Sequence, residues 1–381
     1  MMKQYCTPIS ILCTVTTLLL FAGCRKEIGV IPPKTTQVMP AGSYGEGTDF
    51  YLLNEGNMGS NHCSLDYFNH QQGTYALNIY ESVNPAATLG LGDVGNDIQI
   101  YGGKLYIVVN GSDKVEVLDK TTAVKLCQIS IDNCRHLAFW NKKVLITSYD
   151  GFVGVVDTSR LQNGAGTVFL DSQIAVGREP EGLAVAGDQL YVANSGGYSP
   201  PLYDNTVSVI DLSSQTVTKH IQLGVNLNDV QKDDYGHIIV SARGDYGATA
   251  PSFFILNAVT GAQIKHVEIP IENFTIKDSL MYYFTSSYNL QGQQQAVTYE
   301  TFNLRTLTST DNSFLSREAS AKIKSPYALA VDPNGDKILI SDAGDHTSPG
   351  SLYWISTDGA IDWQVQTGEV PGHIAFLQYT N

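Results

Sequence analysis

Residues 181–224 read EGLAVAGDQLYVANSGGYSPPLYDNTVSVIDLSSQTVTKHIQLG, and the fold of the chain can be predicted from this stretch. It holds four short runs that are typical of β-strands: GLAVA, QLYVANS, TVSVID and VTKHIQL. The first run is almost continuously apolar, as in a strand buried on both faces, and the second and third carry β-branched and aromatic residues. Gly, Asp, Asn, Ser and Pro separate the runs. The stretch therefore predicts a unit of four short strands joined by turns.

The same unit recurs along the chain, and its clearest marker is the polar residue that closes the third strand. Asx and Ser side chains in this position hydrogen-bond the backbone of a tight turn. Units of four strands with a period near 45 residues are the signature of a β-propeller. The markers therefore predict an all-β fold, a seven-bladed β-propeller with four-stranded blades. In chain order they are Asn69, Asp119, Asp157, Asp211, Asn257, Asn303 and Ser356.

The first blade indicates how the ring closes. The segments FYLLNE, SLDYFN and TYALNIY supply its second, third and fourth strands, but no innermost strand precedes them. The segment GHIAFL at 372–377 matches the innermost strands of the other units. We therefore expect the C-terminal strand to complete the N-terminal blade, which covers the edges that an open ring would expose.

The N-terminus predicts export and lipidation. Residues 1–23 combine Lys3 with a short apolar run and small residues before Cys24, as in a signal peptide. The ending FAGC resembles a lipobox with Phe21 where Leu is usual, which predicts a lipid on Cys24; the alternative is an ordinary secretory signal in which this cysteine is incidental. Residues 24–48 are predicted to be a flexible tether and residues 49–381 the propeller.

The net charge and the cysteine positions limit the kinds of ligand and partner that the chain is expected to bind. The formal net charge of −14 disfavours nucleic acid. No Cys/His spacing suits a metal, and no metal is predicted. Cys127 and Cys134 either form a disulfide or remain as two buried thiols, and the sequence leaves both open.

The connections indicate on which face a ligand would bind. Turns between first and second strands are short, as in AGD at 186–188, whereas those between second and third strands are long, as in SGGYSPPLYDN at 195–205. In a propeller these long loops share one face with the fourth-to-first connections. Binding residues are expected on that face.

Two columns of residues are predicted to ring the mouth of the central channel, at the start of the innermost strands. They either bind a ligand or hydrogen-bond neighbouring blades. With nearby tyrosines, which offer a rigid ring and a polar tip, they predict a polar, aromatic-rich bowl. The outer column is Asn96, Arg135, Glu181, Asn228, Asn273, Tyr327 and Gly372, and the inner column is Asp97, His136, Gly182, Asp229, Phe274, Ala328 and His373. The candidate ligand-binding residues are Arg135, Tyr149, Arg178, Asn194, Tyr198, Tyr203, Asn228, Arg243, Tyr246, Phe274, Tyr288, Tyr327, Asp342 and His346.

Signals for catalysis are weak. GxSxG, HExxH and Walker motifs are missing from the sequence. His346 beside Asp342 and Asp345 is more typical of turn hydrogen bonds than of an acid–base or metal cluster. Seven-bladed lactonases and sugar dehydrogenases exist, but the sequence favours a binding protein that is not an enzyme and has no cofactor.

Three segments carry a resemblance to a known family. LYVANS (190–195), VSVID (207–211) and VGREPEGLAV (176–185) resemble the YVTN-repeat, YncE-like propellers. With the lipobox and tether, the chain resembles propeller lipoproteins on Gram-negative outer membranes. One group of these captures cobalamin (vitamin B12) and hands it to a TonB-dependent transporter. The resemblance implies a lipid-anchored, surface-exposed outer-membrane protein with cobalamin or a related corrinoid as ligand and that transporter as partner.

Two other functions stay open: a glycan-binding or glycan-uptake accessory protein, and a scaffold that binds only protein. A corrinoid is broad, nearly neutral and rimmed by amides, which suits a bowl of Asn, Tyr, Arg and Asp. Sugars usually stack on Trp, and Trp140, Trp354 and Trp363 fall in or beside strands rather than in the long loops. This placement favours the corrinoid.

Overall fold

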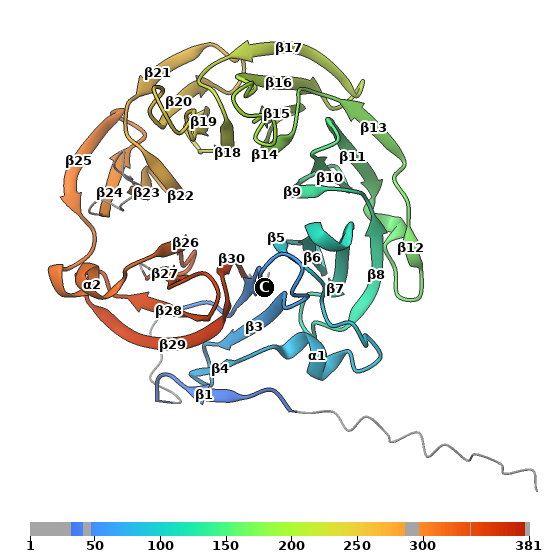
Figure 1. Ribbon diagram of the computed structural model, residues 1–381, viewed down its shortest axis with the longest axis vertical. Coiled ribbons are helices and arrows are strands. Elements are labelled where there is room, and N and C mark those ends of the chain that lie inside the picture. Colours follow the sequence, from blue (N-terminus) through green and yellow to red (C-terminus); the bar gives the residue numbers. More distant parts are fainter. Residues whose placement is uncertain (1–31, 41–46, 286–296, 336, 378–381) are drawn as a thin grey trace, which may run out of the picture.

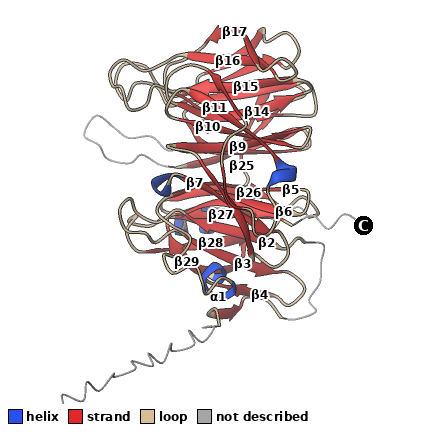
Figure 2. Cartoon of the chain, turned by 90° about the vertical axis from the view of Figure 1, so that its right-hand side faces the viewer, coloured by secondary structure: helices blue, strands red, loops and turns tan. Residues whose placement is uncertain are grey.

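Seven β-sheets surround a central axis in the computed structural model, which describes residues 32–40, 47–285, 297–335 and 337–377 (Figure 1). The sheets follow one another around the ring in chain order, and each has its first strand at the axis except the first blade, which has the last described strand there. Seen from the side, the described chain is almost entirely strand and loop (Figure 2). The prediction of an all-β, seven-bladed propeller is confirmed.

The strands of each blade are given from the inner to the outer one. The first blade consists of β30 (Pro371–Phe376), β2 (Phe50–Asn54), β3 (Ser64–Asn69), β4 (Thr74–Ala76) and β1 (Thr35–Gln37), and the second of β5 (Gly95–Tyr101), β6 (Lys104–Val109), β7 (Lys114–Asp119), β8 (Lys125–Ser130) and β12 (Gly166–Val168). The third blade consists of β9 (Cys134–Trp140), β10 (Lys143–Ser148), β11 (Phe152–Asp157) and β13 (Ser172–Ala175), and the fourth of β14 (Pro180–Ala186), β15 (Gln189–Asn194), β16 (Thr206–Asp211) and β17 (Thr216–Gln222).

The fifth blade is β18 (Leu227–Lys232), β19 (His237–Ala242), β20 (Ser252–Asn257) and β21 (Gln263–Val267); the sixth is β22 (Ile271–Lys277), β23 (Leu280–Thr285), β24 (Thr298–Asn303) and β25 (Thr308–Ser313); the seventh is β26 (Pro326–Val331), β27 (Ile338–Asp342), β28 (Pro349–Ile355) and β29 (Ile361–Glu369). Two short helices, α1 (Ile79–Val83) and α2 (Arg317–Lys322), lie in connections between blades. The first two blades thus carry a fifth, outermost strand beyond the predicted four.

The ring closes as the sequence predicts. Strand β30 pairs antiparallel with β2, with Phe376 opposite Phe50 and His373 opposite Leu53. Figure 1 shows this closure as the red C-terminal strand beside the blue N-terminal blade. No inner edge of the first blade is left exposed, because the last described strand of the chain covers it.

The polar residues that close the third strands shape the turns that follow them. The Asp119 carboxylate accepts the backbone N–H groups of Thr121 and Thr122 at 3.0 and 2.9 Å. The other Asx markers accept backbone N–H groups two or three residues ahead in the same way, at Asn69, Asp157, Asp211, Asn257 and Asn303.

The apolar core lies between neighbouring blades. Tyr191 and Val209 of the fourth blade are fully buried against Leu227 and Leu256 of the fifth, and similar clusters join the other blades. Burying a side chain of this size contributes about 1.5–3 kcal/mol relative to leaving it exposed. The blades are therefore held together by packing of their faces rather than by strand pairing.

Each inner strand begins with a β-bulge. Two residues of β9, Arg135 and His136, lie opposite the single residue Thr147 of β10, and equivalent shifts occur in all seven blades. A bulge leaves a backbone N–H without its ladder partner and turns side chains away from the pleat. The bulges thereby aim side chains at the mouth, which is the end of the channel where the inner strands begin.

Hydroxyl groups of the second strands satisfy the bulges and join the blades. Thr147 Oγ1 accepts the backbone N–H of His136 at 3.0 Å and donates to the carbonyl oxygen of Glu181 in the next blade at 2.8 Å. Ser341 makes the equivalent pair of bonds between the seventh and first blades, at 2.7 and 2.6 Å. Buried backbone groups need such partners, so each hydroxyl stabilises two blades at once.

The described cysteines are reduced. Cys63, Cys127 and Cys134 are free and buried, so the second of the two alternatives for Cys127 and Cys134 holds. Burial raises the pKa of the Cys127 thiol to about 11, which keeps it protonated near neutral pH.

The predicted signal peptide and Cys24 lie outside the described residues. Within the predicted tether, Thr35–Gln37 form strand β1, which pairs with β4 at the rim of the first blade. None of the helices in the described part of the chain combines the length and the hydropathy of a membrane-spanning segment. The domain boundaries therefore stay a prediction.

A glycine in a bulge provides a test of the crowding around the axis. A Cβ atom at Gly182 would lie 2.7 Å from the backbone oxygen of Asn228 and from the backbone nitrogen of Val230. Since these are main-chain atoms of the neighbouring inner strand, we expect Gly182→Ala to lower the free energy of unfolding by about 1–3 kcal/mol. Urea denaturation measures this loss.

Gly103→Ala is the matched control, because a Cβ atom there would meet nothing within 4 Å. It should unfold like the parent protein. Equal stability of the two variants would contradict the close approach of the inner strands at Gly182.

Candidate functional site

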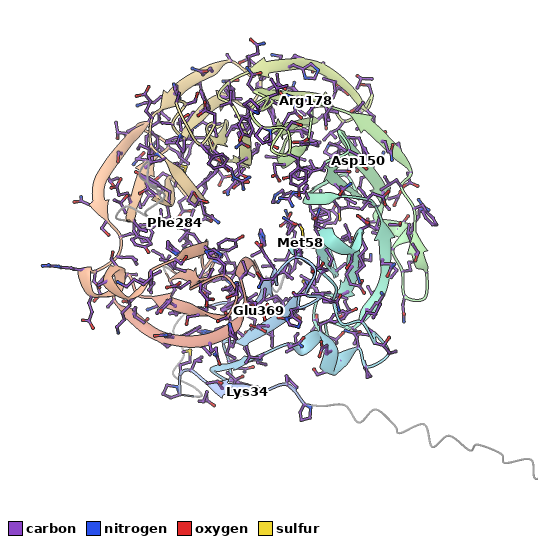
Figure 3. All side chains as sticks on the ribbon, viewed as in Figure 1. Lys34, Met58, Asp150, Arg178, Phe284 and Glu369 are labelled. Atoms are coloured by element: carbon purple, nitrogen blue, oxygen red, sulfur yellow. The ribbon has the colours of Figure 1, made fainter. Side chains whose placement is uncertain are left out.

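A cavity of about 620 Å³ lies at the mouth and continues down the channel. The bulged residues of all seven inner strands line it, together with side chains from the long loops, including Met58, Tyr198 and Arg243. Figure 3 labels Met58 beside the centre of the ring, whereas Lys34 lies at its outer edge. The predicted columns and the predicted loops therefore meet at one cavity.

The sixth blade departs from the predicted columns by one residue. In β22 the bulged residue is Glu272, which lies between the paired residues Ile271 and Asn273. Glu272 and Asn273 therefore occupy the outer and inner positions predicted for Asn273 and Phe274. The Phe274 side chain is only 2% exposed and packs into the core cluster of this blade, although its backbone borders the cavity.

A buried carboxylate organises one side of the mouth. Glu181 is 1% exposed, and its oxygens accept hydrogen bonds from Arg135 Nε at 2.9 Å and from the Tyr149 hydroxyl. Arg243 approaches the same carboxylate, with Nη1 to Oε1 at 3.5 Å. The guanidinium of Arg135 also lies 4.4 Å from the centre of the Tyr149 ring. We call Arg135, Tyr149, Glu181 and Arg243 the Glu181 cluster.

The Glu181 cluster keeps its carboxylate ionised. Burial alone would raise the pKa of Glu181, but the positive charges of Arg135 and Arg243 and a hydrogen bond with His136 hold this pKa well below its usual range. Paired charges of opposite sign compensate the loss of water that burial imposes. The cluster is therefore a fixed ionic group at physiological pH.

The other side of the mouth is organised by Glu55. Its carboxylate accepts the Tyr327 hydroxyl at 3.0 Å and lies 3.1 Å from His373 Nε2. Burial alone would lower the pKa of His373, but the hydrogen bond and the charge of Glu55 raise it above its ordinary value. The His373 ring also packs edge-on against that of His136, with centroids 6.4 Å apart, so the two histidines of the inner column lie close together.

A repeated motif forms part of the floor. The sequence Asn-Asp-Ile-Gln at 96–99 in the second blade recurs as Asn-Asp-Val-Gln at 228–231 in the fifth. In each copy the Gln amide donates to the Asp two residues earlier and to a carbonyl oxygen of the next blade; the acceptors are Leu137 at 2.7 Å and Phe274 at 2.8 Å. Both aspartates are thereby held at the wall of the channel.

The two copies differ in what their asparagines contact. Asn96 Oδ1 accepts a hydrogen bond from Arg135 Nη1 at 2.9 Å. In the blade that follows the second copy, Glu272 occupies the bulge position that Arg135 occupies after the first. Within the described part of the chain, neither Asn228 nor Glu272 has a side-chain hydrogen bond or ion pair. The asparagine of the first copy is therefore hydrogen-bonded within the protein, whereas the asparagine of the second copy is open to the cavity.

Tyrosines and apolar side chains stand above this polar floor. Tyr198 packs edge-on against Tyr149 with ring centroids 4.7 Å apart, and Tyr203 and Tyr246 form a second pair at 6.4 Å. The exposed fractions of Tyr198 and Tyr246 are 64% and 76%, and those of Leu202 and Met58 are 71% and 74%. We call Met58, Tyr198, Leu202 and Tyr246 the rim; all four lie on loops between second and third strands.

The structure brings many of the predicted site residues together. In the cavity wall or directly against it lie Arg135, Tyr149, Tyr198, Asn228, Arg243 and Tyr327, and Tyr203 and Tyr246 belong to the loops beside it. His346 is exposed and packs edge-on against Tyr327, at 5.7 Å between ring centroids. Arg178 anchors the 195–205 loop by donating to the carbonyl oxygen of Leu202 at 2.5 Å. Tyr288 lies outside the described residues.

Two predicted residues are turned inward and are corrections. Asn194 is fully buried and uses its amide to bind Thr206 and Ser208, both at 2.9 Å. Asp342 accepts the backbone N–H groups of Lys324 and Gly344 at 2.7 and 2.8 Å, which fixes a turn. Each of the two side chains ends a second strand and is committed to the scaffold, since Asn194 also accepts the backbone N–H of Gly177 at 3.1 Å.

Among the cavity residues that the sequence analysis did not single out are Glu55, Met58 and Glu272. Glu55 and Met58 follow the second strand of the first blade in the segment NEGNMG, a loop of the predicted kind. Glu272 carried no signal, because the bulge that exposes it is a property of strand pairing. No group of His, Cys, Asp and Glu suited to a metal ion occurs among the described residues.

Together these features describe a seven-bladed β-propeller with a polar cavity at the channel mouth and an aromatic rim. Residues 48–345 match the family DUF5074, described as a domain of unknown function, and the chain belongs to this family. No curated protein matches the chain significantly.

Three solved structures that resemble the chain in fold share little sequence with it. The chain is similar to Kuenenia stuttgartiensis hydrazine synthase (15% identity, TM-score 0.59, covering 74% of this chain and 89% of that one). It is also similar to a quinoprotein alcohol dehydrogenase-like protein from Bacteroides thetaiotaomicron (14% identity, TM-score 0.60, 87% and 79%) and to the designed Ika8 protein (12% identity, TM-score 0.51, 91% and 95%). At these identities the likeness shows the fold alone, and the absence of enzymatic activity stays a prediction.

The Glu181 cluster leads to a stability prediction. Glu181→Gln leaves Arg135 and Arg243 without their counter-charge, so at pH 7 it should lower the free energy of unfolding by about 3–5 kcal/mol. Because the pKa of Glu181 is lower in the folded than in the unfolded protein, its carboxylate contributes fully to the free energy of unfolding at a pH above the unfolded-state pKa. This contribution is lost as the pH falls below that value. The gap between parent and variant should therefore be constant from pH 7 to about 5 and shrink in stronger acid.

Denaturation curves at pH 7, 5 and 3 measure the gap. Asp245→Asn is the control, since that carboxylate only caps a turn in an exposed loop. A gap that grows toward pH 3 would contradict the ionised state of Glu181 in the folded protein.

Proposed function

We propose that this protein captures a small ligand at the channel mouth, and that the ligand is cobalamin or a related corrinoid. The observation that carries this proposal is the combination of an exposed aromatic and apolar rim with a floor of amides and compensated charges. A propeller presents such a surface on a rigid scaffold, so little conformational freedom is lost on binding. The chain would act as a binding protein rather than as an enzyme.

The charge balance of the mouth supports a nearly neutral ligand. The two cavity arginines, Arg135 and Arg243, both face the buried Glu181, while Glu55, Asp97, Asp229 and Glu272 add further carboxylates. A polyanion would therefore meet repulsion from several sides. A corrinoid presents a broad apolar face to the tyrosines and carboxamides to the polar floor.

The rim supports a corrinoid over a glycan. Its aromatic members are tyrosines, and Trp354 and Trp363 stack on each other in the core between the seventh and first blades, with ring centroids 5.3 Å apart. Trp140 lies at the end of β9 and donates to Asp188 at 3.1 Å. The described loops of the mouth thus lack the tryptophan platform on which sugars usually stack.

The site would work at the cell surface. We assign the lipid anchor to Cys24, with the propeller outside the outer membrane and a TonB-dependent transporter as the partner that receives the corrinoid. This assignment is supported by the FAGC segment and by the resemblance of the chain to cobalamin-capture lipoproteins.

The rim is tested by Tyr198→Ala combined with Tyr246→Ala. Truncating a stacked tyrosine costs roughly 2 kcal/mol or more in a central contact. We therefore expect the double variant to bind cyanocobalamin at least about tenfold more weakly, with an unchanged melting temperature because both side chains are exposed. Calorimetric titration of the full chain in detergent measures the affinity.

The matched control is Phe169→Ala combined with Tyr235→Ala, two exposed aromatic residues away from the mouth. Weaker binding in the control but not in the rim variant would mean that the site lies elsewhere. If the parent protein binds members of a glycan panel and no cyanocobalamin, the corrinoid assignment is wrong and the glycan function replaces it.

The anchor is tested by Cys24→Ala. The variant should leave the membrane fraction as soluble protein or accumulate as an unprocessed precursor, because no thiol is available for the lipid. Fractionation and immunoblotting follow the protein, with Cys63→Ala as the control cysteine. A processed Cys24→Ala protein that stays in the membrane fraction would mean that lipidation is not the anchor.

A further inference from the structure

Some polar side chains of the mouth are already hydrogen-bonded within the protein, and others are not. On one side Glu55 is engaged by Tyr327 and His373, and in the Glu181 cluster Arg135 is engaged by Glu181 and Asn96. These groups are already satisfied by the protein and offer a ligand little new bonding.

The sector between the fifth and sixth blades is different. Within the described residues, the amide of Asn228 and the carboxylate of Glu272 line the cavity without a side-chain hydrogen bond or ion pair. Arg243 faces Glu181 with one nitrogen at 3.5 Å, and its side chain is 40% exposed. Its remaining N–H groups are therefore available as donors.

These three side chains are neighbours in the fold. Leu227 pairs with Ala242 at one end of the fifth blade, Asn228 and Arg243 directly follow these two residues in the chain, and both line the cavity. Asn228 and Glu272 are bulged residues of consecutive inner strands. The walls of the cavity raise the pKa of Glu272 while the charge of Arg243 lowers it, which is consistent with their closeness.

From this juxtaposition we infer that Asn228, Arg243 and Glu272 form a subsite for a primary carboxamide of the ligand. A carboxamide has a carbonyl oxygen that accepts and an NH₂ group that donates. Arg243 supplies donors for the oxygen, the Glu272 carboxylate accepts from the NH₂ group, and Asn228 can do either. The inference rests on the proposed function, because it assigns the polar edge of the same bound ligand.

The subsite predicts discrimination between an amide and an acid. If the NH₂ group is replaced by a negatively charged oxygen, that oxygen meets the Glu272 carboxylate and no proton is left to donate. Bonds to a charged group are the stronger kind, and an unpaired charge in a cavity is costly. The protein should therefore reject a ligand whose carboxamide at this position has been hydrolysed.

The experiment compares cyanocobalamin with its mono-acids, in each of which one peripheral carboxamide is a carboxylate. By calorimetry on the full chain, we expect at least one mono-acid to bind about tenfold more weakly than cyanocobalamin. Glu272→Gln should weaken binding of cyanocobalamin by about tenfold and should reduce the discrimination against that mono-acid to under about threefold.

Glu318→Gln is the matched control, since Glu318 lies in α2 with its side chain 86% exposed and should change neither affinity. If Glu272→Gln binds cyanocobalamin and all mono-acids as the parent does, the subsite is wrong while the proposed function stands. If the parent protein does not bind cyanocobalamin, the proposed function fails and the subsite falls with it.

Discussion

The crowding of seven inner strands around one axis shapes both the scaffold and the cavity of this protein. Neighbouring strands approach so closely at Gly182 that even a methyl group would clash with backbone. Each strand begins with a bulge, and the freed backbone groups are buried and need partners. Thr147 and Ser341 supply them from the second strands and reach the next blade as well. The bulges at the crowded axis also turn polar side chains into the channel, so the fold and the site depend on the same feature.

The mouth contains charged groups that are held in place by ion pairs and polar groups that are open to the cavity. A carboxylate as deeply buried as Glu181 is stable only with cations beside it, and Arg135 is consequently held in place. Asn228 and Glu272 line the cavity near this group, and Arg243, which belongs to it, directs one nitrogen to Glu181 and keeps its other N–H groups open. A rigid cluster beside unsatisfied groups is a favourable design for binding, because the scaffold does not have to reorganise when a ligand arrives.

Function in this protein has to be read from the site rather than from the fold. DUF5074 is a family of unknown function, and the similar propellers share 15% identity or less with this chain. Propellers host many unrelated activities, since the blades supply only a platform and the mouth-facing loops supply the chemistry. The rim of Met58, Tyr198, Leu202 and Tyr246 and the floor beneath it are therefore the features that distinguish this chain.

The blade number, the turn after each third strand and the ring closure could all be predicted from the sequence, because they follow from a repeated local pattern of apolar runs and turn residues. The same repeat predicted Arg135, Asn228 and Tyr327 at the mouth, since each occupies the same point of its unit. That Glu272 and Asn273 rather than Asn273 and Phe274 occupy the mouth positions of the sixth blade emerged only from the packed strands, because the bulge lies one residue earlier than the sequence indicates and a one-residue shift moves Phe274 from the channel to the core. The scaffold role of Asn194 and the contact of Glu55 with Tyr327, across 272 residues of sequence, are likewise properties of the folded ring, because such partners are set by how the blades pack and not by neighbours in the chain.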